Sequence, residues 1–131
     1  MDAMMVRELS LVHDRFCRSL ADPKRLLIMT ALAEGERCVS DIAREVGLRQ
    51  ANVSQHLALL RDRGIVRHRR QGARIYYSLT SPKFLRALAL LREILREEMA
   101  SGQVPAPLLA SAVGAALGNG CEGAALTVQS N

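Results

Sequence analysis

The chain has 131 residues, of which 49% are hydrophobic and only 3% aromatic, and its formal net charge is +5. This length favours one domain, and a core built from aliphatic side chains suits packed helices. No apolar run reaches the roughly 18 residues that a membrane span requires, and the N-terminus lacks the pattern of a secretory signal, so a cytoplasmic protein is expected.

Two helices are predicted at the start of the chain. Residues 7–20 carry apolar side chains at helical spacing. Asp22 and Pro23 then form a start signal, because Asp is a good N-cap and Pro suits the first helical turn. The second helix would run to Ala33 and end before Gly35.

Residues 39–79 predict a helix, a turn, a second helix and a basic hairpin, in that order. The first helix, over 39–48, would be closed by Gly47, because Gly adopts a left-handed conformation at little cost. The second helix, over 50–60, is polar on one face and apolar on the other. Its buried stripe would consist of Val53, Leu57 and Leu60, with Leu59 or Ala58 alongside.

A basic hairpin is predicted after this second helix. β-type runs at 65–66 and 75–79 surround Gln71 and Gly72, a typical hairpin signal. The segment 61–74 holds six arginines and one acid. A local charge excess of this kind indicates a polyanionic partner such as nucleic acid.

The end of the chain divides into a helix and an appendage. Ser81 and Pro82 would open a last helix that fades near residue 98. Residues 101–131 are rich in Ala and Gly and nearly uncharged, which predicts a C-terminal tail that is partly disordered or forms a short helix over 108–117. The predicted domain of DNA binding and dimerisation is therefore 1–100. The apolar stripe of the last helix would be Phe84, Leu88, Leu91 and Leu95.

The segments 20–26, 38–43, 54–61, 64–66 and 72–79 resemble, in order and spacing, those of the ArsR/SmtB family of small bacterial repressors. The resemblance covers roughly residues 8–98. It implies a winged helix-turn-helix, mostly α with a small β-hairpin wing, and a homodimer formed through the first and last helices. The second helix of the motif would enter the major groove of a double-stranded DNA operator. A two-fold dimer would place two such helices about one DNA turn apart on a palindrome.

Nine side chains of the motif are candidates for DNA contact. Gln50, Asn52, Gln55 and His56 can hydrogen-bond base edges, and Ser54 can reach a base or a phosphate. For Asn52 and Ser54 the alternative is a role in capping the helix. Four arginines are expected to contact phosphate: Arg49, Arg61, Arg70 and Arg74. Of these, Arg70 and Arg74 flank the wing turn and could instead enter a narrow minor groove.

The known metal sites of the family are incomplete here. Where the resemblance would imply a cluster of three Cys on the third helix, the chain has Cys38, Ser40 and Ala43. The last helix carries glutamates but no His, and oxygen ligands alone are poor for zinc. A persulfide-responsive pair is also missing, since Thr30 occupies one Cys position and the last helix has no Cys.

Three thiols remain as candidates for sensing, namely Cys17, Cys38 and Cys121. Together they could hold a soft metal or metalloid ion such as As(III) or Cd(II), and a pair of them could form a reversible disulfide. The alternative is that Cys17 and Cys38 are small core residues and Cys121 is a solvent thiol. His13, His56 and His68 are expected on different elements and form no metal cluster.

The function predicted from these features is a sequence-specific transcriptional regulator, a repressor released from its operator by a small effector. Two alternatives remain: a thiol-based redox regulator, and a winged-helix protein-interaction module without an effector. The chain has no Gly-rich phosphate loop after a strand, no nucleophile elbow and no His/Glu metal pair on one helix, so an enzyme is not expected.

Overall fold

The computed structural model describes residues 1–103, so the predicted tail lies outside the described residues from residue 104 on. Among the described residues, no helix is both long and apolar enough to cross a membrane. The elements, in chain order, are α1 (Ala3–Val12), a π-helical turn η1 (His13–Cys17), a 3-10 turn η2 (Ser19–Ala21), α2 (Pro23–Ala31), β1 (Arg37–Cys38), α3 (Val39–Val46), α4 (Gln50–Asp62), β2 (Val66–Gln71), β3 (Arg74–Leu79) and α5 (Lys83–Ala100).

The core lies where α2, α3 and α4 pack beside the sheet. Ile28 of α2 and Ile42 of α3 are fully buried, as is Ile65 just before β2. Full burial of an aliphatic side chain of this size contributes about 1.5–3 kcal/mol. The stripe predicted on α4 is confirmed, since each of its three members is 0% exposed: Val53, Leu57 and Leu60. Of the two residues expected alongside, Leu59 is half-buried and Ala58 is exposed.

The turn between α3 and α4 forms as predicted. Gly47 ends α3 in the left-handed region, with φ +74°. The amides of Gly47 and Leu48 both donate to the carbonyl of Ala43, which satisfies the free end of the helix. Leu48 is buried, so the turn is held by the core and sets the direction in which α4 begins.

The hairpin is part of a larger sheet than predicted. β2 and β3 pair in antiparallel register, with Gly72 in the connecting loop at φ +63°. β1 adds a third strand on the other side of β3, giving the order β1-β3-β2. A strand of two residues, Arg37 and Cys38, is too short to show an alternating pattern, which is why the sequence did not reveal it.

The predicted first helix over 7–20 is helical in the structure, but as three segments of different type and with an earlier start. The α-helix begins earlier, because the Asp2 carboxylate caps it by accepting a hydrogen bond from the Met5 amide at 2.7 Å. The α-helix ends at Val12, and the chain continues as η1 and η2. A π-helical turn keeps a helical pattern of apolar residues, so its altered hydrogen bonding does not show in the sequence.

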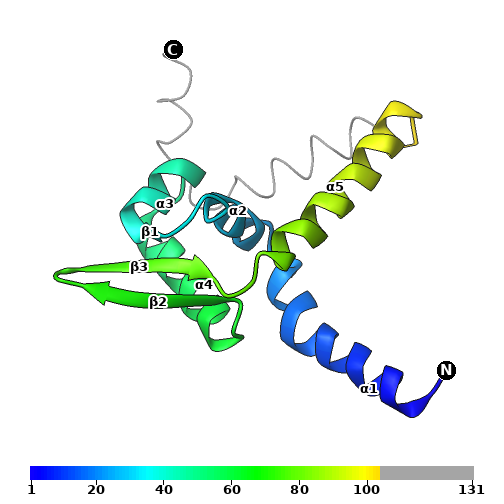
Figure 1. Ribbon diagram of the computed structural model, residues 1–131. Coiled ribbons are helices and arrows are strands. Elements are labelled where there is room, and N and C mark those ends of the chain that lie inside the picture. The colour runs from blue at the N-terminus through cyan, green and yellow to red at the C-terminus, as the bar shows by residue number, and fades with distance from the viewer. Residues whose placement is uncertain (104–131) are drawn as a thin grey trace.

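α1 and α5 extend away from the body on the side opposite the β2-β3 ribbon (Figure 1). Neither helix has a buried residue. Their bases meet where the rings of Phe16 and Phe84 make an edge-to-face contact, with centroids 5.3 Å apart. Beyond that contact both helices expose large apolar side chains, including Leu9 at 53% and Leu91 at 63%. We call α1 and α5 the arms.

Candidate nucleic-acid interface

α4 presents its candidate residues on three sides. Since successive helical residues are about 100° apart, Gln55 lies opposite the buried stripe, and it is exposed. Gln50, Ser54 and Arg61 share one flank, while Asn52 and His56 share the other. The capping alternative for Asn52 and Ser54 is not observed, because Arg49 is the N-cap residue and no side-chain hydrogen bond caps α4.

The first flank of α4 faces the hairpin. The Nη1 atom of Arg61 lies 3.5 Å from the Nε2 atom of His68 in β2, and the His68 ring stacks on Tyr77 at 5.9 Å. Arg61 is exposed although it lies next to the strand. At Arg61, the last turn of α4 therefore adjoins β2, which brings the exposed surfaces of α4 and the hairpin together.

The second flank faces the start of α2, and His56 is turned toward it. Its side chain is only 15% exposed, with Nδ1 accepting a hydrogen bond from Arg25 Nε at 3.3 Å and Nε2 3.9 Å from an Asp22 carboxylate oxygen. Burial lowers the pKa of His56, and Arg25 and Lys24 lower it further, while Asp22 opposes them. A neutral ring with its proton on Nε2 leaves Nδ1 free to accept the hydrogen bond from Arg25 and turns the N–H toward Asp22, so contacts within the protein orient His56.

The arginines of the hairpin are not equivalent. Arg69 donates to Glu36 at 2.6 Å and lies over the ring of Tyr76 at 5.0 Å, and the hydrogen bond from Arg69 lowers the pKa of Glu36. Arg67 donates to the carbonyl of Thr80 at 3.2 Å. Within residues 1–103, Arg70 and Arg74 are exposed, and their guanidinium groups have no hydrogen-bond or ion-pair partner.

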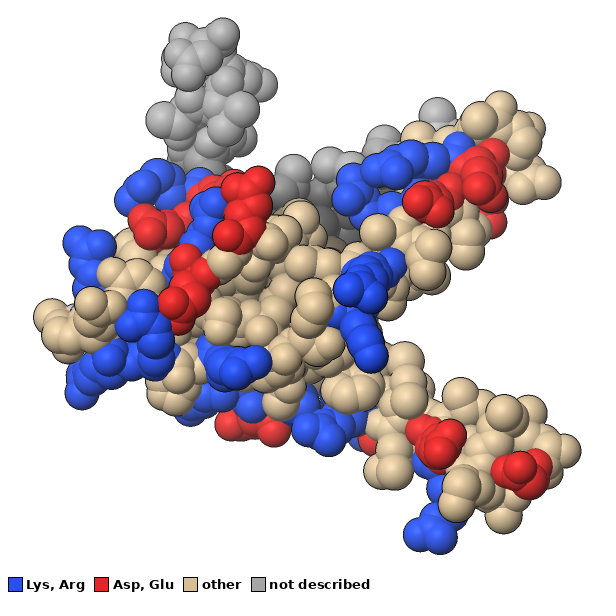
Figure 2. Space-filling model, in the orientation of Figure 1, with Lys and Arg blue, Asp and Glu red and all other residues tan. Residues whose placement is uncertain are grey.

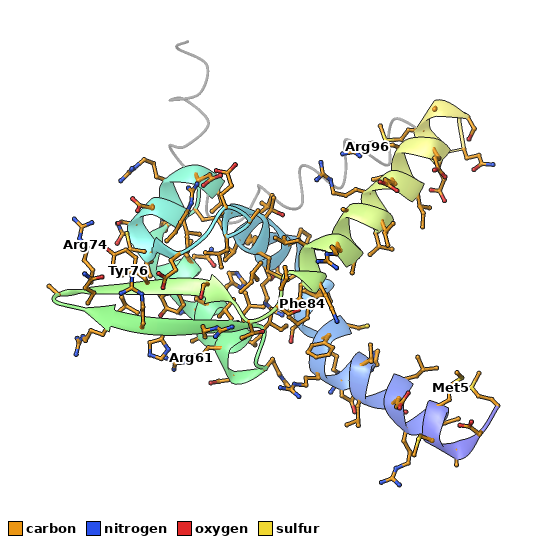
Figure 3. The ribbon with its side chains drawn as sticks, in the orientation of Figure 1. Met5, Arg61, Arg74, Tyr76, Phe84 and Arg96 are labelled. Carbon is orange, nitrogen blue, oxygen red and sulfur yellow. The ribbon has the colours of Figure 1, made fainter. Side chains whose placement is uncertain are left out.

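Figure 3 shows Arg74 toward the free end of the hairpin, with Tyr76 nearer the body and Arg61 beside β2. In the space-filling view, Lys and Arg side chains gather over the hairpin end of the molecule, while Asp and Glu lie among them near α3 (Figure 2). The arginines with unengaged guanidinium groups are thus at the tip of the hairpin. A planar, permanently charged group at such a tip suits contact with phosphate oxygens.

The two cysteines among the described residues, Cys17 and Cys38, are not part of this surface. Cys38 is buried at the junction of β1 and α3, with its sulfur 3.2 Å from both Ser40 Oγ and Asp41 Oδ2. Cys17 is exposed on η1, and both thiols are free. In the described part of the chain, no group of three or more His, Cys, Asp or Glu residues is placed to hold a metal ion. Cys121 lies outside the described residues.

Comparison with known proteins agrees with this geometry. A family model described as the bacterial regulatory protein, arsR family, matches residues 22–68. A solution structure described as a homodimeric winged helix-turn-helix DNA-binding domain of Mycobacterium bovis is 32% identical, with a TM-score of 0.64, and the match covers 76% of this chain and 91% of that chain. The chain belongs to the ArsR family. Its winged helix-turn-helix fold, mostly α with a small sheet, is as predicted.

Two named relatives of this ArsR-family chain are also similar to it. It is 43% identical over 79 residues to nodulation protein NolR of Rhizobium meliloti, matching 60% of this chain and 65% of the relative. It is 38% identical over 78 residues to a probable mercury resistance operon repressor of Streptomyces lividans, matching 60% of this chain and 62% of the relative. The matches thus span less than two thirds of the length of these two relatives.

Sequence reasoning missed the residues that hold the interface in place. Arg25 is 31 residues from His56, and Glu36 is 33 residues from Arg69. Neither separation has a periodic or motif signal, because both contacts depend on how α2 packs against α4 and how β1 aligns with β3. The chain contains ordinary surface residue types at these positions, and only the fold shows their partners.

Proposed function

We propose that this ArsR-family chain is a homodimeric repressor that binds a palindromic duplex DNA operator in the bacterial cytoplasm, and we assign it no catalytic activity. The observation that carries the proposal is the surface formed by the exposed side of α4 and the adjoining hairpin. Its centre has an exposed amide, Gln55, and its outer edge has two unengaged arginines, Arg70 and Arg74. An amide at the centre of a helix can read adenine in the major groove, and arginines at a wing tip can reach phosphates or a narrow minor groove.

The nine predicted contacts divide into roles under this proposal. Gln50, Asn52 and Gln55 read bases, and Ser54 contacts a base or a phosphate. Because His56 is mostly covered and held by Arg25, its role becomes one of support for α4, with base contact limited to its exposed edge. The residues proposed to neutralise phosphates are Arg49, Arg61, Arg70 and Arg74.

The exposed apolar surface of the arms is an argument for the homodimer. Two helices without buried residues and with exposed Leu, Ile, Val and Met side chains are costly in water for a small isolated protein. A second copy of the chain, packing arm against arm around a two-fold axis, would remove this surface from water. The same axis would present two copies of α4 to two half-sites of one operator.

The test is a titration of the wild-type protein against duplex DNA from the region upstream of its own gene. We expect a complex of two protomers per duplex with a dissociation constant of about 10 nM or tighter, competed poorly by random duplex. Binding that random DNA competes equally well would contradict the sequence-specific regulator. No binding to any duplex, with specific capture of another protein instead, would favour the interaction module.

For the effector, we propose a soft ion, such as As(III) or Cd(II), bound by thiols. Cys38 supports this proposal, because it lies in β1, which pairs with the wing strand β3, and it immediately precedes α3. Recruiting its sulfur to an ion would break its contacts with Ser40 and Asp41. Such a change would displace the start of the helix-turn-helix. Cys17 and Cys121 are the proposed further ligands.

The alternative is oxidation, in which peroxide converts two of the thiols into a disulfide and is itself reduced to two water molecules. Operator release by arsenite, Cd(II) or peroxide, measured for the wild type and for Cys17→Ser, Cys38→Ser and Cys121→Ser, separates the two. An ion that releases DNA only when the thiols are present supports the first proposal. If none of the three agents releases DNA, thiol-based sensing is wrong.

A further inference from the structure

The end of α4 is tied to the base of the arms through one side chain. Arg15 lies in η1, directly after α1, and its Nε donates to the carbonyl of Arg63 at 3.1 Å. Arg63 is the C-cap residue of α4. A cation at this position interacts favourably with the negative end of the helix dipole and satisfies a carbonyl that the helix leaves free.

The guanidinium group of Arg15 also packs closely against the backbone of Gly64. A Cβ atom at Gly64 would lie 2.6 Å from an Arg15 terminal nitrogen, closer than real contacts allow. Gly64 also has φ +74°, which glycine adopts at little cost. The backbone at the end of α4 therefore approaches the Arg15 side chain closely, and the contact is directional because the guanidinium is planar.

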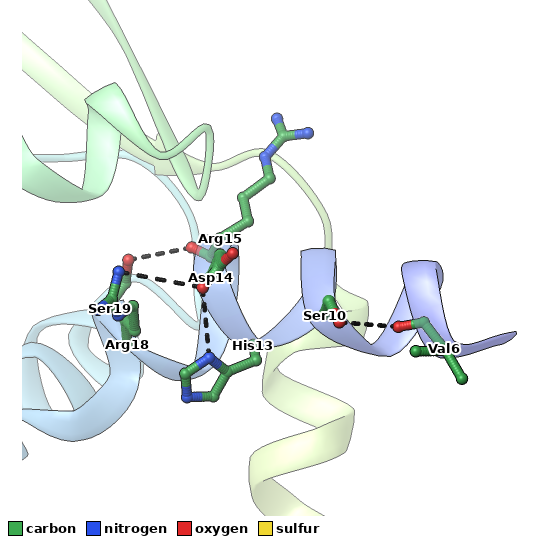
Figure 4. A network of polar contacts seen from close by, with 7 residues as sticks. All are labelled: Val6, Ser10, His13, Asp14, Arg15, Arg18 and Ser19. Atoms are coloured by element: carbon green, nitrogen blue, oxygen red, sulfur yellow. Dashed lines mark hydrogen bonds and ion pairs between the residues drawn. The ribbon is translucent and has the colours of Figure 1, made fainter. Parts of the chain in front are cut away.

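The other side of Arg15 reaches the arms. Its guanidinium carbon lies 5.5 Å from the centroid of the Phe16 ring, which in turn contacts Phe84 near the start of α5. In Figure 4 the Arg15 side chain extends away from the His13 ring, which contacts the Asp14 carboxylate. Arg15 thus stands where α1, α5 and the end of α4 come together.

We infer that Arg15 is a positioning residue, which fixes the angle between the arms and α4 and thereby sets the operator half-site spacing that the dimer accepts. This inference rests on the proposed function. If the arms form the two-fold interface, the distance between the two α4 helices is set by this angle in each of the two protomers. Without the link at Arg15, α4 still has its buried stripe, so each half would still bind but over a wider range of positions.

The experiment compares Arg15→Gln with a matched variant, Arg7→Gln. Arg7 lies on α1 and is exposed, so each change removes one positive charge, from α1 or from the turn that directly follows it. A palindromic operator is first selected with the wild-type protein, and duplexes are then made with one base pair added to or removed from its centre. Each base pair rotates one half-site by about 35° relative to the other.

For the wild type and Arg7→Gln, we expect each change of spacing to weaken binding by about tenfold or more. For Arg15→Gln, we expect this penalty to fall to about threefold or less, while binding to a single half-site stays within about twofold of wild type. Sedimentation and far-UV circular dichroism establish that each variant is a folded dimer. If Arg15→Gln does not fold, Arg15→Lys, which keeps the charge but not the planar group, takes its place.

A wild-type spacing profile in a folded Arg15 variant would overturn the inference and leave the proposed function intact. A loss of half-site binding as large as the loss on the full operator would also overturn it, because Arg15 would then be needed for the shape of α4 itself. If the wild-type protein selects no duplex at all, the proposed function fails, and the inference fails with it.

Discussion

The part of the molecule that carries the helix-turn-helix and the arms are built in opposite ways. α3, α4 and the sheet enclose Ile42, Leu57 and Ile65, all fully buried, and their exposed residues are mostly polar or basic. α1 and α5 bury no residue and expose apolar side chains over most of their length. The first region has a complete core in one chain. In the second, Phe84 and Leu88 at the base of α5 pack against that core, but the apolar faces farther along the arms have no partner in the described part of the chain.

This difference means that the folding of the winged helix-turn-helix and the pairing of two chains depend on different residues. The winged helix-turn-helix draws its stability from a core to which the outer parts of the arms contribute nothing. Replacing an apolar side chain far along an arm with a charged one should therefore change the oligomeric state without unfolding the DNA-binding region. Substitutions on the exposed side of α4 should change DNA binding without altering the dimer.

The largest effect is expected from Leu91→Glu. A carboxylate at this position on α5 would be buried without a partner in an arm-to-arm interface, which is strongly unfavourable. We expect a folded monomer and a decrease in operator affinity of about 100-fold or more, since the two half-sites would no longer be bound by linked units. Sedimentation equilibrium and operator titration measure the two effects.

The matched control for this prediction is Ala89→Glu. Ala89 lies three residues after Arg86 and four before Glu93, so it shares the charged side of α5. The same carboxylate there should leave both the dimer and the operator affinity within about twofold of wild type. If Leu91→Glu remains a dimer, α5 is not an interface and the contrast between the two regions loses its basis.

The second-largest loss of operator affinity is expected from replacing Gln55, at the centre of the exposed side of α4. Gln55→Ala should weaken binding to the cognate operator by about 1–3 kcal/mol and binding to random duplex hardly at all. Gln103→Ala, which removes the same side chain beyond the end of α5, serves as the control. A titration in which both duplexes bind more weakly by the same factor would mean that Gln55 does not read bases.

A smaller loss of affinity is expected at the wing, where replacing Arg74 can be compared with replacing Arg69. Arg74→Ala should weaken binding to all duplexes alike and reduce the slope of log affinity against log salt by about one for each phosphate that the arginine neutralises. Arg69→Ala should reduce it less, because Glu36 already engages that guanidinium. Titrations at several salt concentrations test this. Equal slopes for wild type and Arg74→Ala would show that Arg74 does not neutralise a phosphate.

The sequence predicted the parts of the fold that have a periodic or conformational signal. The stripe on α4, the left-handed Gly47 and the hairpin around Gly72 were all predicted correctly for this reason. The two-residue β1 and the π-helical turn η1 have no such signal. Polar residues on α4 were recognised as candidates, but the inward orientation of His56 was not, because its partner Arg25 comes from another helix.

His56 provides the smallest expected effect, and it tests whether the two regions are coupled. Arg25 donates to His56 and also to the carbonyl of Ser19 in η2, the turn between η1 and α2. Burial is the main cause that lowers the pKa of His56 in the folded protein. Because the folded pKa lies below the unfolded one, the unfolded chain takes up the proton first as pH falls. The stability due to neutral His56 is therefore present above about pH 6.5 and is lost as pH falls through the folded value.

His56→Gln isolates this contribution, because glutamine keeps an acceptor for Arg25 but does not titrate. Urea denaturation at a fixed protein concentration, between pH 7.5 and 5, gives the free energy of unfolding for both proteins. The wild type should lose stability relative to His56→Gln as the pH is lowered, since a protonated ring places an N–H against the Arg25 donor. A difference between the two proteins that is constant with pH would mean that proton uptake by His56 is not linked to unfolding. In that case the contact between His56 and Arg25 would not make the free energy of unfolding depend on pH.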